Sequence, residues 1–302
     1  MIVILGPTAS GKTQFSLNLY EQINCEIISA DSRQVYKYLD VGTAKPPKTI
    51  LNEYKHHIID FLEPNEEFSV GQFVKLSKEI IEDLYQKNKI PLIVGGTGLY
   101  IDSLCNGFIE LPISNSDKEI RKKLTQELET HGKDYLFKKL QKIDPESAKK
   151  YSDMNPRRLI RALEFFHQTG IKFSEAHNEF TKKTDFNIFY FGINYDRKTL
   201  YQRINQRTDW MWKNGLLEET EQILKMGFSP SLNSLNTVGY KEVIKFLNNE
   251  WNKQQALEEI KKNTRRYAKR QLTWFRKNKK IHWIEPNLVD KFIISYFIVN
   301  QK

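Results

Sequence analysis

The segment from residue 6 to residue 13 has the composition and order of a phosphate-binding loop. Its sequence, GPTASGKT, fits the pattern G-x-x-x-x-G-K-[ST]. The glycines let backbone N–H groups turn inward around phosphate oxygens, Lys12 supplies a cation, and the Thr13 hydroxyl is a ligand for Mg²⁺. We therefore expect a phosphate or diphosphate, with Mg²⁺ as cofactor, on Gly6, Pro7, Thr8, Ala9, Ser10, Gly11, Lys12 and Thr13.

Two further polar residues follow apolar runs that read as strands. Asp31 comes directly after the run 26–30, and Thr97 follows the run 90–94 after Gly95 and Gly96. A hydrolytic ATPase with this loop usually has an aspartate at the end of a strand like 90–94. Gly95, Gly96 and Thr97 stand there instead, which argues against a motor or switch NTPase. Asp31 could hold Mg²⁺, cap a helix or take a proton from an acceptor, and its position leaves these roles open.

Arginines form two clusters. Arg203 and Arg207 are four residues apart on the helix expected after the run 187–195, so they share one face and could fold over phosphates as a lid. A solvated helix surface is the alternative, although their place directly after a strand favours the lid. The second cluster, in the sequence PRRLIR from Pro156 to Arg161, carries little weight alone.

The pattern of the chain predicts a scaffold that brings these residues together. Apolar strands at 2–5, 26–30, 90–94 and 187–195 alternate with helices at 11–20, 69–87 and after 195. Such alternation predicts an α/β fold with a parallel sheet covered on both faces, like that of P-loop NTPases. Ligands of these sheets bind at the carboxyl ends of the strands, where the polar residues fall.

The remaining segments read as helices. Residues 113–186 form a helical insertion, which leaves residues 1–112 and 187–302 as the catalytic core. Its helix starts are marked by Ser116 with Glu119, by Asp144 before Pro145 and by Asn155 before Pro156. The chain from residue 210 onward is again mostly helical, with one buried stripe of Leu257, Ile260, Thr264, Tyr267, Ala268, Leu272 and Phe275.

The excess positive charge is concentrated in one segment. The 302 residues carry 47 Lys and Arg against 37 Asp and Glu, and residues 261–280 hold ten of the cations and no acid. A solvated helix face is the ordinary reading of such a run. Tyr267, Trp274 and Phe275 are interleaved with the cations here, as on a surface that follows a phosphate backbone, so we favour nucleic acid as the partner.

Composition also bounds the location of the protein. The apolar runs are far shorter than the roughly 18 residues of a membrane span, and no basic region precedes the first of them. Cys25 and Cys105 are the only cysteines and form no CxxC motif, which argues against a disulfide framework or a zinc module. We expect a cytoplasmic protein without a membrane partner.

Taken in order, the motifs resemble those of the tRNA dimethylallyltransferases, also called tRNA isopentenyltransferases, of the bacterial type. The resemblance spans almost the whole chain and rests on GPTASGKT (6–13), DSRQVYKYLDVGTAKP (31–46), HHIID (56–60), FSVGQF (68–73), VGGTGLY (94–100), NPRRLIRALE (155–164), VGYKE (238–242) and RRYAKRQLTWFR (265–276). An ordered series of this kind is far more specific than one loop motif.

The resemblance implies transfer of a dimethylallyl group from dimethylallyl diphosphate to the exocyclic amine of the adenine 3′-adjacent to the anticodon of tRNAs. Asp31 would be the general base, Ser32, Arg33 and Gln34 would contact the adenine and its neighbours, and Thr97 would contact the bridging oxygen of the diphosphate. Lys12, Thr13, Arg203 and Arg207 would hold its charge. The anticodon stem-loop would contact the insertion through Arg121, Arg157, Arg158, Leu159, Ile160 and Arg161.

Three other readings remain open from the sequence. A small-molecule kinase would share the sheet, the loop and the arginine lid, and a transferase acting on free adenine nucleotides would share the donor site. The helical insertion and the basic run 261–280 speak against both. A non-catalytic RNA-binding module would have no use for the loop, Asp31 and Thr97. We expect a monomer, because an asymmetric tRNA needs only one such surface.

Overall fold

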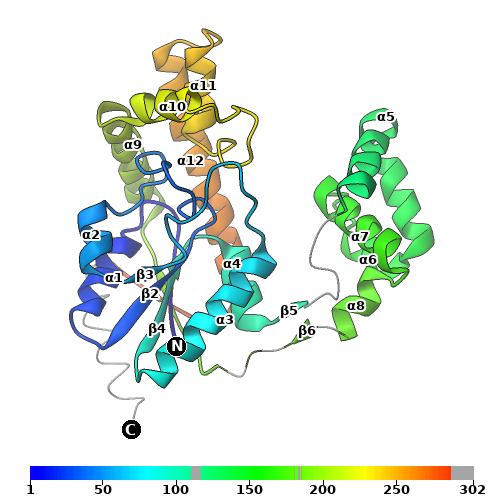
Figure 1. Cartoon of the computed structure of the whole chain (residues 1–302), viewed down its shortest axis with the longest axis horizontal. Helices are drawn as coiled ribbons and strands as arrows, with labels where there is room; N and C mark the ends of the chain where they lie inside the picture. Colours follow the sequence, from blue (N-terminus) through cyan, green and yellow to red (C-terminus); the bar gives the residue numbers. More distant parts are fainter. Residues whose placement is uncertain (110–116, 180, 183, 185, 287–302) are drawn as a thin grey trace. The chain divides into compact units, whose positions relative to one another are not determined.

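The computed structural model describes residues 1–109, 117–179, 181–182, 184 and 186–286 (Figure 1). Two compact units are formed: Met1–Cys105 with Asp185–Lys302, and Asn106–Thr184. In the described part of the chain, no helix combines the length and the apolar character needed to cross a membrane.

The first unit is built on a six-stranded parallel sheet, as the alternation of strands and helices predicts. The strand order is β3-β2-β4-β1-β7-β8. The strands are β1 (Ile2–Leu5), β2 (Cys25–Ala30), β3 (His56–His57), β4 (Ile90–Gly95), β7 (Phe189–Ile193) and β8 (Ile281–Ile284). Because β1 lies between β4 and β7, the loop that follows it opens at the centre of the sheet.

Apolar side chains on both faces of the strands explain why the sheet is covered on both sides. All four residues of β1 are buried, and successive side chains of a strand point to opposite faces. Ile2 and Ile4 pack with Phe15 and Leu19 of α1 (Lys12–Tyr20). Helix α3 (Val70–Gln86), which packs against β4, begins at a capping box formed by Ser69 and Gln72.

The sequence pattern did not predict two of the strands and several of the short helices in this unit. β3 has only two residues, and β8 follows a long helix in a segment that we expected to be helical. The other helices are α2 (Lys48–Glu53), α4 (Gly98–Asn106), α9 (Arg197–Lys213), α10 (Leu216–Lys225), α11 (Tyr240–Leu247) and α12 (Lys253–Phe275). Figure 1 shows α9 to α12 gathered beyond the carboxyl ends of the strands.

The buried stripe of α12 is only partly as expected. Ile260, Thr264, Ala268 and Phe275 are buried, but Leu257, Tyr267 and Leu272 are half-buried. Ala256 and Gln271 complete the buried face instead. The prediction of the buried face from apolar residues alone was therefore partly wrong. The helix also buries a glutamine, which is possible because its amide has hydrogen-bond partners inside the protein.

The second unit is a small helical body. It consists of β5 (Phe108–Ile109), α5 (Lys118–Ile143), α6 (Pro145–Lys150), α7 (Pro156–Thr169), α8 (Phe173–Glu179) and β6 (Thr181–Lys182). Helix α5 is broken at Gly132, where the backbone leaves the helical region, and α5 packs on α7 around Leu124, Leu140 and Leu163.

The limits of this unit and one of its helix starts differ from the sequence expectation. The unit runs from 106 to 184, and the short strands β5 and β6 near its two ends pair with each other; the expected boundary at 112/113 lies outside the described residues. Asp144 and Asn155 cap α6 and α7, as expected. The cap of α5 is Asp117, one residue beyond Ser116, which is also outside the described residues.

Candidate active site

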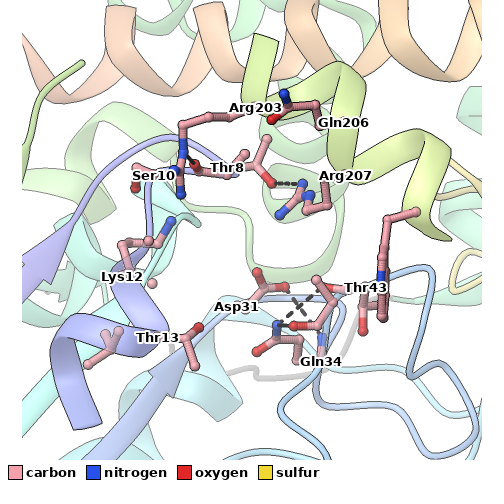
Figure 2. Close-up of a pocket in the computed structure, with 16 residues that line it drawn as sticks. Thr8, Ser10, Lys12, Thr13, Asp31, Gln34, Thr43, Arg203, Gln206 and Arg207 are labelled. Atoms are coloured by element: carbon pink, nitrogen blue, oxygen red, sulfur yellow. Dashed lines mark hydrogen bonds between the residues drawn. The ribbon is translucent and has the colours of Figure 1, made fainter. Parts of the chain in front are cut away.

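A cavity of about 540 Å³ opens at the carboxyl ends of β1, β2 and β4. Helix α9, which follows β7, supplies its remaining wall. Figure 2 shows the cationic side chains Lys12, Arg203 and Arg207 around one part of the cavity and Asp31, Gln34 and Thr43 around another. The lining residues are Thr8, Ala9, Ser10, Gly11, Lys12, Thr13, Asp31, Gln34, Thr43, Ala44, Val94, Gly95, Arg203, Gln206, Arg207 and Trp210.

The loop between β1 and α1 is shaped to surround an anion. Gly11 adopts φ 87°, a conformation that favours glycine, and α1 begins at the next residue, so its N-terminus points at the cavity. The Lys12 ammonium donates to the carbonyl oxygens of Gly6 (3.0 Å) and Pro7 (2.8 Å). The buried hydroxyl oxygen of Ser10 has no hydrogen-bond partner among the described residues. A ligand with several acceptor oxygens fits this loop.

Burial makes the charged form of Lys12 less stable than it is in water. It lowers the pKa of the ammonium to about 8; the nearby carboxylate of Asp31 opposes this shift and the Arg207 guanidinium adds to it. Among the described residues, the Lys12 ammonium contacts carbonyl oxygens and forms no ion pair with a carboxylate. A bound anion would supply the missing counter-charge, so the electrostatics favour a multiply charged ligand.

The two arginines of α9 reach the loop as the lid reading predicts. Arg203 donates from Nε to the carbonyl oxygen of Ala9 (2.8 Å), and its guanidinium lies 4.9 Å from the centroid of the Tyr195 ring. Arg207 donates to the Thr8 hydroxyl, and burial lowers its pKa to about 10. Three cations from two distant segments therefore converge on one cavity.

Asp31 is held rigidly across the cavity from these cations. Its Oδ1 accepts the backbone N–H groups of Arg33 (2.8 Å) and Gln34 (3.4 Å). Its Oδ2 accepts no hydrogen bond from the residues that the structure describes. The carboxylate thus has a fixed orientation and an oxygen that remains able to accept a proton.

The residues next to Asp31 divide into those that line the cavity and those that support it. The Gln34 amide donates to the carbonyl oxygens of Thr43 (3.2 Å) and Ala44 (3.1 Å), and these residues line the cavity. Arg33 donates to the carbonyl oxygen of Asn233 (2.7 Å), on the segment between α10 and α11. Ser32 donates its N–H to the Thr97 hydroxyl (3.0 Å), so Thr97 and the Asp31 loop are joined directly.

Several residues of this site have no sequence motif that would single them out. Gln206 and Trp210 line the cavity from α9, and Glu219 of α10 accepts the N–H groups of Asp40, Val41 and Gly42. For Gln206 and Trp210, the one signal in the sequence was their helical spacing from Arg203 and Arg207. Gln271 and Tyr267 lie in the block RRYAKRQLTWFR, in which we assigned no catalytic role and placed Tyr267 in the buried stripe. They contact the loops that carry Thr8 and Thr97.

The expected RNA contacts of the second unit are only partly available at its surface. Arg121, Arg157 and Arg158 are exposed, and Arg158 also pairs with Asp153 (3.4 Å). The side chains of Leu159 and Ile160 are buried in the helical core, so a contact of these two residues with RNA would be through the backbone, and it stays a prediction. A helix with one exposed face must turn its apolar residues inward. Arg161 is half-buried and pairs with Glu164 (3.2 Å).

Comparisons with known proteins agree over nearly the full chain. A family model described as IPP transferase matches residues 34–278, and one described as Isopentenyl transferase matches residues 1–63. The tRNA dimethylallyltransferase of Thermoanaerobacter sp. (strain X514) is 44% identical over 286 residues, which cover 94% of this chain and 90% of that protein. The tRNA dimethylallyltransferase of Acetivibrio thermocellus is 44% identical over 292 residues, with coverages of 96% and 93%.

Solved structures agree as well. The tRNA isopentenylpyrophosphate transferase from Bacillus halodurans is 35% identical and superposes with a TM-score of 0.71, covering 97% of this chain and 95% of the other. A eukaryotic dimethylallyltransferase acting on tRNA is 31% identical, with a TM-score of 0.81 and coverages of 95% and 73%. The fold is therefore P-loop-like, as the phosphate-binding loop at residues 6–13 and the parallel sheet indicate.

Proposed function

The chain belongs to the IPP transferase family, and from this premise we propose that it transfers a dimethylallyl group from dimethylallyl diphosphate to the exocyclic amine of the adenine 3′-adjacent to the anticodon of tRNAs, forming isopentenyladenosine. The observation that carries the proposal is the pairing, in one cavity, of a rigid carboxylate with three cations. The cations suit a diphosphate leaving group, and the carboxylate suits an acceptor that must lose a proton.

The reaction needs charge stabilisation on the donor side. As the C–O bond to the diphosphate breaks, the leaving group departs with the electron pair and gains negative charge. Lys12, Arg203 and Arg207 line the cavity where this charge would develop, and the amides at the start of α1 add to their effect. Strand β4 ends without the aspartate that hydrolytic ATPases carry at such a position. This is consistent with the use of the loop for a leaving group, since no water has to be activated for attack on phosphorus.

The acceptor side needs a base. When the adenine amine forms its new bond to carbon, the nitrogen becomes positively charged and its proton passes to Asp31. The hydrogen bonds from Arg33 and Gln34 keep the carboxylate in place for this transfer. Thr97 accepts the Ser32 N–H and retains its own hydrogen, which it can donate to the bridging oxygen of the diphosphate.

Mg²⁺ is the cofactor that we propose for the donor. The Thr13 hydroxyl lines the cavity, and the buried Ser10 hydroxyl, which has no hydrogen-bond partner among the described residues, lies in the same loop. In phosphate sites Mg²⁺ takes most of its ligands from water and from the phosphates, so the single protein oxygen of Thr13 is compatible with this ion. When bound, Mg²⁺ would neutralise part of the diphosphate charge.

The tRNA contacts form the third part of the proposal. The adenine must leave its stacked position to reach Asp31, so the enzyme should act on a loop rather than on a duplex. Arg266, Lys269 and Arg270 of α12 are exposed, as are Arg121 and Arg157 of the second unit. These cations would hold the backbone of the anticodon stem-loop. We propose that the enzyme works as a monomer in the cytoplasm.

The substitution Asp31→Asn tests the proposal most directly. Asparagine keeps an oxygen that accepts the Arg33 and Gln34 N–H groups, but it cannot take a proton. The single-turnover rate at saturating tRNA and dimethylallyl diphosphate should fall by roughly 10² to 10⁴, with unchanged tRNA affinity. Asp83→Asn, at an exposed position on α3, is the matched control and should keep the wild-type rate. A rate for Asp31→Asn near wild type would make Asp31 structural.

The nature of the acceptor and donor is tested separately. A nucleoside digest of the treated tRNA should show an adenosine with an added dimethylallyl mass. Modification of AMP in place of tRNA would support the transferase of free nucleotides. Consumption of ATP with phosphorylation of a small acceptor would support the kinase.

A further inference from the structure

The second half of α12 faces the catalytic loops with three side chains that contact consecutive residues. Tyr267, Gln271 and Trp274 are spaced by four and three residues, so they lie on one face of the helix. Gln271 donates to the carbonyl oxygen of Gly96, and the Tyr267 side chain lies close to that of Thr97. Trp274 packs so closely on Gly98 that a Cβ there would collide with its indole ring.

Gln271 has a second contact that joins two separate loops. Its Oε1 accepts the N–H of Thr8 in the phosphate-binding loop (2.8 Å), while its Nε2 donates to the carbonyl oxygen of Gly96 (2.9 Å). Gln271 is only 6% exposed, and a Cβ on Gly96 would collide with its amide nitrogen. One buried amide thus holds the loop after β1 and the loop after β4 at a fixed separation.

The same helix is also anchored to the helix that carries the arginine pair. Arg265 donates to the side chain of Asn205 (2.8 Å), which lies between Arg203 and Arg207 on α9, and Lys261 pairs with Asp209 (2.9 Å). These contacts leave α12 little freedom to shift relative to the cavity. Gln271 therefore projects from a fixed support.

We propose that Gln271 is a positioning residue for the transfer reaction, which sets the separation between the phosphate-binding loop and Thr97. The inference rests on the proposed function, because it assumes that the loop holds the diphosphate and that Thr97 contacts its bridging oxygen. Loss of the amide leaves the half-buried N–H of Thr8 and the buried carbonyl oxygen of Gly96 without this partner, so the two loops move to find other partners. A misplacement of about 1 Å at a reacting group can reduce a rate by about 10²-fold.

The substitution Gln271→Met tests the proposal, because methionine has nearly the same length and makes neither hydrogen bond. The single-turnover rate at saturating substrates should fall about 10- to 100-fold, with tRNA affinity changed less than about twofold. Gln254→Met is the matched control: it is the same change at an exposed position of the same helix, and should keep the wild-type rate.

A double-mutant cycle with Thr97→Ala separates positioning from general damage. If Gln271 acts by placing Thr97 against the diphosphate, Gln271→Met should cost at most about threefold in the Thr97→Ala background. Full multiplication of the two rate losses would overturn the proposal. A slow Thr97→Ala enzyme combined with a wild-type rate for Gln271→Met would also overturn it and leave the proposed function intact.

The failure of the proposed function has a different signature: the wild-type enzyme itself would then add no dimethylallyl group to tRNA, so no rate loss in any variant could be measured. A wild-type rate for Thr97→Ala alone would remove the role of Thr97, and the positioning role of Gln271 with it. If Gln271→Met does not fold, Gly96→Ala replaces it, since the new methyl group displaces the Gln271 amide and leaves the glutamine in the chain. The same loss of rate, again non-multiplicative with Thr97→Ala, is the expected result, and a wild-type rate would overturn the proposal.

Discussion

Binding of dimethylallyl diphosphate should weaken as the pH rises above about 8, because Lys12 loses its proton in the free enzyme near that pH. Burial lowers the pKa of this ammonium from 10.5 to about 8, a shift that corresponds to about 3 kcal/mol against the charged form. A bound diphosphate supplies the missing counter-charge and raises the pKa again. The complex therefore holds a proton that the free enzyme has lost, and binding takes up that proton above pH 8.

The size of the effect follows from the fraction of protonated Lys12. If the bound diphosphate restores the pKa to near 10.5, about one tenth of the free enzyme is protonated at pH 9, so the Kd should rise about tenfold between pH 7 and pH 9. The donor itself does not change charge in this range, since the last phosphate pKa is about 6. Arg207, whose pKa is lowered to about 10, begins to contribute only above this window.

Isothermal titration calorimetry in two buffers of different ionisation enthalpy measures both quantities. We expect uptake of about one proton per donor at pH 9 and about a tenth of a proton at pH 7. Lys12→Met should bind more weakly at pH 7 and lose the dependence between pH 7 and pH 9. A wild-type Kd that is equal at pH 7 and pH 9, without proton uptake, would refute the assignment of Lys12 as the buried cation that meets the diphosphate.

Two further predictions concern the leaving group and the RNA surface. Thr97→Ala and Arg203→Ala should each slow catalysis, and the double variant should lose less than the product of the two effects, because both side chains would act on one developing charge; single-turnover rates that multiply fully would place them at separate sites. Replacing Arg266, Lys269 and Arg270 by Gln should weaken tRNA binding and reduce the slope of log affinity against log salt by about one per lost phosphate contact. If the variant has the wild-type melting temperature and also the wild-type slope, this face of the helix is only a solvated surface and does not bind RNA.

Arg265 is left out of that variant because the structure gives it another task. Its guanidinium is bonded to Asn205, so its loss would disturb α9 and the arginine pair. The spacing of basic residues along the sequence cannot distinguish a cation that faces the solvent from one that braces a neighbouring helix. Affinity for dimethylallyl diphosphate should remain at the wild-type value in the triple variant, which serves as its control.

Local sequence by itself determined the core of the fold and the donor half of the site. The loop from Gly6 to Thr13 is contiguous, and its glycines, lysine and threonine work through the backbone of a strand–loop–helix unit. The strands β1, β2, β4 and β7 are apolar enough to be recognised singly, and parallel pairing brings their carboxyl ends to one edge. The position of Asp31 beside the loop therefore follows from the sequence alone.

Tertiary structure decided which distant groups meet at that edge. Gln271 binds Thr8 across 263 positions of sequence, and Glu219 of α10 fixes the loop at Asp40. A buried polar side chain needs a partner, but the sequence pattern does not say which one, because the contact depends on how two helices pack. Packing against neighbours, not local preference, also made residues 281–284 a strand beside β7. It likewise decided that the side chains of Leu159 and Ile160 face the helical core.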